Sequence, residues 1–152
     1  MKKKRMIIIV LICVLLVGGV IGWKALTDYS RVLDANWCIS LPFKARCSEI
    51  YEKNSGASFH GDGVRYHVFS YKYEDYIDLM FAWGGSPEHE TLYYPSVSEA
   101  AEVWLDAIDV PEEHRPDYSA CFSWNRAKED NSEIIFFWNP EVNRLYIVEN
   151  FI

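Results

Sequence analysis

The first feature of the hydrophobic pattern is an uncharged apolar run near the N-terminus, Met6–Trp23. At 1.5 Å per residue, a helix over this run is about 27 Å long, close to the roughly 30 Å hydrocarbon core of a membrane. Basic residues fill positions 2–5, and only Lys24 follows closely, so the positive-inside rule places the N-terminus in the cytoplasm. We expect a cytoplasmic tail at residues 1–5, a transmembrane signal anchor at 6–23, and an extracytoplasmic remainder.

A cleaved signal peptide is the alternative interpretation of this run. Val20 and Gly22 would then be the −3 and −1 residues of a cleavage site near Gly22, and the protein would be secreted. The run is longer than the usual signal-peptide core, and no A-x-A follows it, which favours the uncleaved anchor. Both interpretations place the rest of the chain outside the cytoplasm.

Beyond the span, residues 24–43 form a juxtamembrane segment whose first part is compatible with a helical extension. Residues 44–152 have the pattern of a folded domain. Val64–Lys72 is the clearest strand, because it is rich in β-branched and aromatic residues. A period of two puts Val64, Tyr66 and Val68 on one face and Arg65, His67, Phe69 and Tyr71 on the other. An earlier strand at Ser48–Lys53 is expected to pair with it across the turn-rich Asn54–Gly63.

Helical spacing dominates the middle of the domain. Ser96 and Glu99 fit a capping box, and a helix with one apolar face should follow and end before Pro111. Pro111–Pro116 fits a short helical turn. Residues 74–83 fit either a helix or a strand, and we favour a helix because acidic residues begin the segment and Gly84 ends it.

Alternation returns in the C-terminal third of the chain. Strands are expected at 119–126, 133–138 and 145–151, and the second of these is apolar on both faces, as in a strand covered on both sides. Together these elements predict an α+β domain: a mainly antiparallel five-stranded sheet with two to three helices.

Charge separates the domain from the anchor. All 22 acidic residues but only 11 of the 15 basic residues follow Trp23, so the remainder of the chain has a formal charge of −11. This charge disfavours nucleic acid and anionic lipid as partners of the domain. It suits cationic ligands or a basic protein partner, and also a simple solvated surface.

Three cysteines follow the span: Cys38, Cys47 and Cys121. An odd number cannot pair completely within one chain. One disulfide, Cys38–Cys47 or Cys47–Cys121, and three reduced thiols are equally compatible with the sequence.

The stretch Ser58–Phe69 contains the only grouping that suggests a metal site: His60, Asp62 and His67. A metal site needs three or four converging ligands, and this spacing does not impose convergence. Asp62 followed by Gly63 is typical of a tight turn. We therefore expect no metal and no cofactor here, and retain these three residues only as weak metal candidates.

Aromatic residues are the one compositional excess, with six Trp, ten Tyr and eight Phe. Most are expected in the core, but aromatic side chains also bind sugars and cations and anchor protein interfaces. Tyr93 and Tyr94, beside Pro95, and Trp83 are the candidates for ligand binding.

No catalytic motif is present: G-x-S-x-G is absent, and Gly61–Gly63 precedes a strand rather than a phosphate-binding helix. We therefore expect a single-pass, membrane-anchored binding or protein-interaction module rather than an enzyme, acting on an envelope protein or glycan. The organisation is typical of small membrane-anchored bacterial proteins. A sugar hydrolase with a carboxylate pair and a small immunity or regulatory membrane protein are the alternatives.

Overall fold

A computed structural model describes residues 29–42, 47–56, 62–73, 77–81, 83 and 93–152. The chain divides into two compact units, residues 1–43 and 44–152. Within the described part of the chain, no helix has both the length and the apolar character needed to cross a membrane. The predicted span at residues 6–23 lies outside the described residues. The first unit contains helix α2 (Tyr29–Trp37), which lies within the predicted juxtamembrane segment.

The second unit is an α+β domain with a five-stranded antiparallel sheet and about three helices, as the sequence predicted. Its strands are β1 (Cys47–Asn54), β2 (Gly63–Tyr71), β3 (Phe122–Ala127), β4 (Glu133–Asn139) and β5 (Arg144–Phe151). Its helices are α3 (Val97–Ala107) and the short 3-10 helices η2 (Glu112–His114) and η3 (Tyr118–Ala120).

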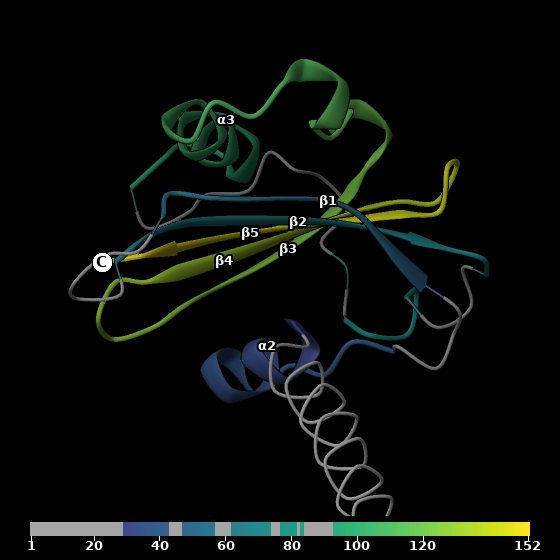
Figure 1. Cartoon of the computed structure of the whole chain (residues 1–152), viewed down its shortest axis with the longest axis horizontal. Helices are drawn as coiled ribbons and strands as arrows, with labels where there is room; N and C mark the ends of the chain where they lie inside the picture. The colour runs from purple at the N-terminus through teal and green to yellow at the C-terminus, as the bar shows by residue number, and fades with distance from the viewer. Residues whose placement is uncertain (1–28, 43–46, 57–61, 74–76, 82, 84–92) are drawn as a thin grey trace, which may run out of the picture. The chain divides into compact units, whose positions relative to one another are not determined.

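The strand order is β1-β2-β5-β4-β3, with every neighbouring pair antiparallel (Figure 1). The predicted N-terminal hairpin and C-terminal meander are both present. They are joined by β2 and β5, whose register runs from Gly63 opposite Phe151 to Ser70 opposite Arg144. The last strand of the chain is therefore central, and this non-local pairing makes one sheet of the two sequence-local parts.

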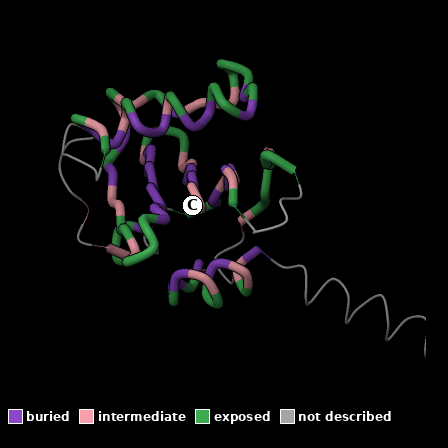
Figure 2. Tube along the Cα trace, turned by 90° about the vertical axis from the view of Figure 1, so that its left-hand side faces the viewer, coloured by how far each residue is buried: buried purple, intermediate pink, exposed green. Residues whose placement is uncertain are grey.

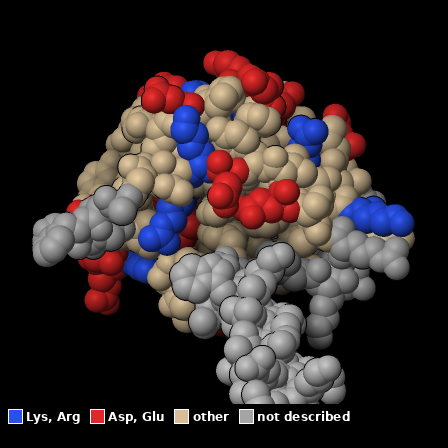
Figure 3. Space-filling view, in the orientation of Figure 1, with Lys and Arg blue, Asp and Glu red and all other residues tan. Residues whose placement is uncertain are grey.

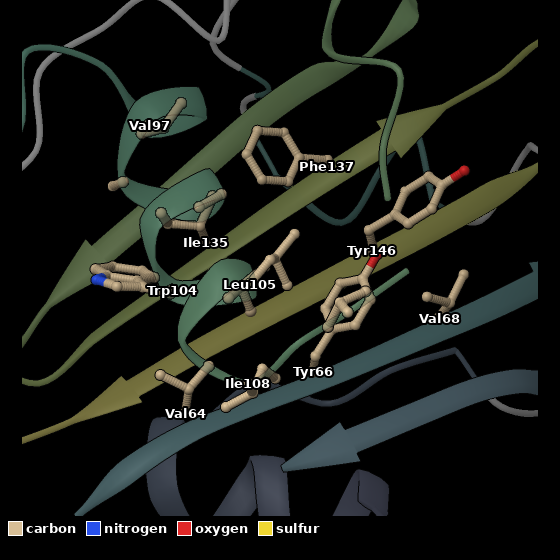
Figure 4. Packing of buried hydrophobic residues seen from close by; sticks show 14 of the residues in the cluster. Val64, Tyr66, Val68, Val97, Trp104, Leu105, Ile108, Ile135, Phe137 and Tyr146 are labelled. Atoms are coloured by element: carbon tan, nitrogen blue, oxygen red, sulfur yellow. The ribbon is translucent and has the colours of Figure 1, made fainter. Parts of the chain in front are cut away.

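Helix α3 covers one face of the sheet, and the main hydrophobic core lies between them (Figure 1). Val64, Tyr66 and Val68 of β2 belong to this core, which confirms the predicted faces of that strand. Leu105 of α3 and Tyr66 of β2 are both fully buried in this core (Figure 4). Figure 2 shows the same division along α3, whose buried positions alternate with exposed ones at helical spacing.

The opposite face of the sheet contains an aromatic cluster. Phe81 stacks on Trp124 of β3 at 4.2 Å between ring centroids and lies 4.9 Å from Phe136 of β4. Trp138 of β4 donates a hydrogen bond from Nε1 to Asp78 Oδ1 at 2.8 Å. Because β4 and β5 contact side chains on both faces, their central residues are all buried, as predicted for β4.

The predicted helix over residues 74–83 is not observed in the described part of this segment. Residues 77–80 form a turn, closed by a hydrogen bond from Met80 N to Ile77 O at 3.0 Å. The same carbonyl oxygen accepts a hydrogen bond from Trp83 Nε1 at 3.0 Å. Ile77 is fully buried and Phe81 packs on Phe136 of β4, while Leu79 between them is 86% exposed.

The other helical predictions are confirmed with shifted boundaries. Ser96 caps α3 by accepting a hydrogen bond from Glu99 N at 3.1 Å, as the capping box predicted. β3 begins at Phe122 rather than at Ser119, because Tyr118–Ala120 form η3 instead. Asp117 caps η3 with a hydrogen bond from Ser119 N to Oδ1 at 3.1 Å.

Candidate functional site

An open pocket of about 540 Å³ lies where α3 meets the η2–η3 segment. Helix α3 contributes Glu102, and the segment after it contributes the rest of the lining. The lining residues are Glu102, Glu112, Arg115, Pro116, Asp117, Tyr118 and Ser119. The lining therefore has three carboxylates and one guanidinium.

Arg115 organises the pocket. Its side chain is only 11% exposed, and Nη1 donates to Glu102 Oε2 while Nη2 donates to Asp106 Oδ1, each at 2.7 Å. Nε and Nη2 also donate to the carbonyl oxygen of Val110, at 3.0 and 2.8 Å. Burial opposes the charge, but the hydrogen bonds to Asp106 and Glu102 outweigh it and raise the pKa of Arg115. The guanidinium is thus permanently charged and satisfied by residues of its own domain.

Glu102 is held from two sides. Its second oxygen, Oε1, accepts a hydrogen bond from the Tyr118 hydroxyl at 2.6 Å. Burial, followed by this bond, raises the pKa of Tyr118, so the phenol stays protonated and keeps donating. Both oxygens of Glu102 therefore bind fixed donors. This arrangement suits a positioned anion better than a carboxyl group that must exchange protons with a substrate.

The η2 helix next to the pocket is tied to the sheet through His114. Tyr66 of β2 donates a hydrogen bond from its hydroxyl to His114 O at 2.5 Å, and Tyr51 of β1 stacks on the His114 ring at 4.0 Å between centroids. Two strands and two short helices consequently fix the backbone on which Glu112 and Asp117 stand. The site is preorganised rather than formed by a loose loop.

Charge in this region is mainly negative. Arg115 is already paired with Glu102 and Asp106, so it does not neutralise the remaining carboxylates of Glu112 and Asp117. Acidic side chains are prominent along the top of Figure 3, over α3 and the segment that follows it. An open pocket with fixed carboxylates attracts ammonium and guanidinium groups and repels phosphates and carboxylates.

The sequence pattern does not single out these pocket residues. Glu102 is on the polar side of a helix, and Glu112 and Asp117 lie in a polar connection, so each resembles an ordinary solvated acid. The spacing between Glu102, Arg115 and Tyr118 follows from how η2 and η3 return toward α3. The only local signal is Asp117 with Ser119, which marks a turn rather than a ligand site.

Of the three weak metal candidates, only Asp62 and His67 belong to the described residues. His60 lies outside the described residues, and Asp62 is an exposed residue just before β2. His67 is on β2, where Nδ1 lies 2.6 Å from Oε1 of Glu49 on β1. His67 therefore contacts a residue of the neighbouring strand, and Asp62, the other described candidate, is not shown beside it.

The aromatic candidates do not share one surface. Tyr94 packs edge-to-face on Trp104 of α3, with ring centroids 6.1 Å apart. Trp83 lies against Phe81 on the opposite face of the sheet. Tyr93 is 61% exposed and is the candidate that remains available to a partner.

Cys38, Cys47 and Cys121 are thiols in the structure, and no disulfide joins any of these described residues. Cys121 is buried in the main core beside α3, and burial raises the pKa of its thiol to about 12. A thiol of this kind is unreactive near neutral pH and acts as a small apolar residue.

No protein-family model, curated protein or solved structure was found to match the chain.

Proposed function

We propose that this protein is a membrane-anchored, non-catalytic binding module whose extracytoplasmic domain binds a basic partner protein. The observation that carries the proposal is the acidic pocket between α3 and the η2–η3 segment. The carboxylates of Glu102 and Asp117 are held in place by hydrogen bonds before any partner arrives, so little ordering of these two groups is needed on binding. The partner group that fits is a lysine or arginine side chain.

The preference for binding over catalysis is supported by how the pocket's polar groups are used. Arg115 and Tyr118 both donate to Glu102, and Asp117 caps η3. These bonds stabilise the local fold and hold the negative charge at one place. The envelope-sugar hydrolase and the small immunity or regulatory protein remain predictions from the sequence.

A matched pair of substitutions tests the pocket. Glu112→Gln removes one charge from the lining, while Glu141→Gln removes one charge from the β4–β5 turn. The full chain in detergent is titrated with a short peptide that contains lysine and arginine, and isothermal titration calorimetry measures the affinity. We expect Glu112→Gln to weaken binding about two- to fivefold, as for one partly exposed ion pair, and Glu141→Gln to leave the affinity unchanged.

Two results would contradict this function. Equal weakening by both substitutions would mean that the peptide senses only the overall charge of the domain. Absence of binding at low ionic strength, where electrostatic attraction is strongest, would rule out the proposal that the partner is basic.

The proposed orientation is testable through Cys38, which is exposed in the structure. After mild reduction, intact cells that make the full chain are treated with a membrane-impermeant maleimide. We expect labelling of the wild type and much weaker labelling of Cys38→Ser, because Cys121 is buried and Cys47 is partly covered. Labelling that requires cell lysis would show that this domain faces the cytoplasm.

A further inference from the structure

A second polar cluster lies on the face of the sheet opposite α3, at the edge formed by β1. The register of β1 with β2 shifts between Glu49, which is opposite Phe69, and Tyr51, which is opposite Val68. Ile50 is therefore the extra residue of a β-bulge. This bulge determines which face of the sheet the side chains on either side of Ile50 lie on.

In a regular strand, residues 49 and 52 point to opposite faces, because successive side chains alternate. The extra residue of the bulge shifts this alternation by one position. Glu49 lies opposite Phe69 and Glu52 opposite His67, and both strand partners belong to the face away from α3. Both carboxylates consequently share one face with the imidazole.

The three side chains converge. His67 Nδ1 and Glu49 Oε1 are 2.6 Å apart, and one donor atom from each of Glu49, Glu52 and His67 lies within 4.8 Å of the other two. The His67 side chain is 12% exposed and its ring lies parallel to that of Phe69, so its position is limited by packing. The two carboxylates are more exposed and can turn toward a common point.

We propose that Glu49, Glu52 and His67 form a binding site for a divalent transition-metal ion of the zinc class. One imidazole nitrogen and two carboxylate oxygens are a ligand set that such ions accept, with water completing the coordination. Ligand bonds of about 2.0–2.2 Å require donors roughly 3.3–3.5 Å apart, so the exposed glutamate side chains must rotate, with Glu49 Oε1 moving away from its present 2.6 Å distance to His67 Nδ1. A metal bound at His67 Nδ1 would replace the present contact of this nitrogen with Glu49 Oε1.

This site is independent of the acidic pocket and goes beyond the proposed function. It also differs from the set His60, Asp62 and His67, because two of its ligands come from β1. A metal held by β1 and β2 would clamp the edge strand β1 to β2. It would also cap an edge strand that can otherwise pair with other chains.

The test uses the full chain in detergent with zinc alone, measured by competition against a chromophoric chelator. We expect one zinc ion per chain in the micromolar range and a rise of a few degrees in melting temperature at saturating zinc. Glu52→Gln and His67→Ala should each weaken binding at least tenfold. Glu141→Gln, a charge-matched change in the β4–β5 turn, should not.

Glu52→Gln keeps the His67–Glu49 contact, so it remains informative if His67→Ala fails to fold. Cobalt substitution separates this site from the thiols: the visible spectrum should lack a thiolate-to-cobalt charge-transfer band. Absence of zinc binding, or binding that survives both substitutions, would overturn the proposal. A thiolate-to-cobalt band would also overturn the proposal. So would loss of zinc binding in His60→Ala when Glu52→Gln and His67→Ala still bind.

Discussion

The Tyr66 hydroxyl on the central part of the sheet donates a hydrogen bond to the main-chain oxygen of His114, at 2.5 Å. Tyr66 is fully buried in the core under α3, and His114 ends the short helix η2. This one bond therefore joins the hydrophobic core to the segment that carries Glu112 and Asp117. Its position makes the pocket sensitive to a change deep inside the domain.

Tyr66→Phe should lower the free energy of unfolding by about 1–2 kcal/mol, because it removes the donor and leaves a partly buried carbonyl oxygen unsatisfied. The measurement is urea unfolding of the full chain followed by tryptophan fluorescence. Tyr93→Phe is the control, since Tyr93 is largely exposed, and it should change the stability by less than about 0.5 kcal/mol. Similar losses in both variants would show that the bond does not contribute.

Alkaline pH should destabilise the domain. Burial raises the pKa of the Cys121 thiol from 9.0 to about 12, and burial likewise raises the pKa of Tyr66. Between pH about 9 and 12 the unfolded chain loses the thiol proton while the folded chain keeps it. The stability contributed by the neutral thiol is complete below this range and is lost as the pH rises through it.

Urea unfolding at about pH 8 and about pH 10.5 checks this sign. We expect the wild type to lose stability between the two values, and Cys121→Ala to lose less, because one of the groups with a raised pKa is absent. Equal losses of unfolding free energy in the wild type and in Cys121→Ala would mean that the buried tyrosines, and not the Cys121 thiol, cause the destabilisation at alkaline pH. Higher stability at the alkaline value would contradict the burial argument.

Gly63→Ala should be one of the more damaging small substitutions in the hairpin. Gly63 has φ +126°, and a Cβ atom there would lie 2.0 Å from Ser55 Oγ, which accepts a hydrogen bond from Val64 N. The alanine must therefore adopt a strained backbone and also displace Ser55. We expect a loss of about 2–4 kcal/mol in the free energy of unfolding.

Gly56→Ala is the matched control in the same connection. Gly56 also has a positive φ, +88°, but a Cβ atom there would meet nothing within 4 Å. It should cost only the backbone strain, about 1–2 kcal/mol, when measured by the same denaturation experiment. A Gly56→Ala loss as large as that of Gly63→Ala would show that the contact with Ser55 is unimportant.

Patterns that repeat within one element were visible in the sequence. The alternation of Val64, Tyr66 and Val68 correctly placed the core face of β2, and the capping box at Ser96 correctly placed the start of α3. These features depend on neighbours a few residues apart. Local spacing is enough to determine them.

Features that depend on distant partners were not visible. The β2–β5 pairing joins residues about eighty positions apart, and the bulge at Ile50 appears only in the register of β1 against β2. Residues 77–80 form a turn, and Phe81 after it packs on Phe136 of the sheet, a contact that a local helix pattern does not reveal. The two candidate sites arise from such non-local contacts, since each combines residues of separate elements.

Arg115→Lys should loosen the acidic pocket while keeping its formal charge. The guanidinium makes hydrogen bonds to Glu102, Asp106 and the carbonyl oxygen of Val110, and a lysine ammonium cannot reach all three with the same geometry. Because both carboxylates are partly exposed, we expect a loss of only about 1–2 kcal/mol in unfolding free energy. Urea unfolding measures this loss.

The same variant separates preorganisation from charge. If fixed carboxylates matter for binding, Arg115→Lys should weaken the affinity for the basic peptide by about two- to fivefold, although no charge is lost. Calorimetry at two ionic strengths checks this, because a purely electrostatic attraction would keep its strength and its salt dependence in the lysine variant. An unchanged affinity would mean that the pocket acts through its charge alone, and the hydrogen bonds of Arg115 would then serve the stability of the α3–η2 junction.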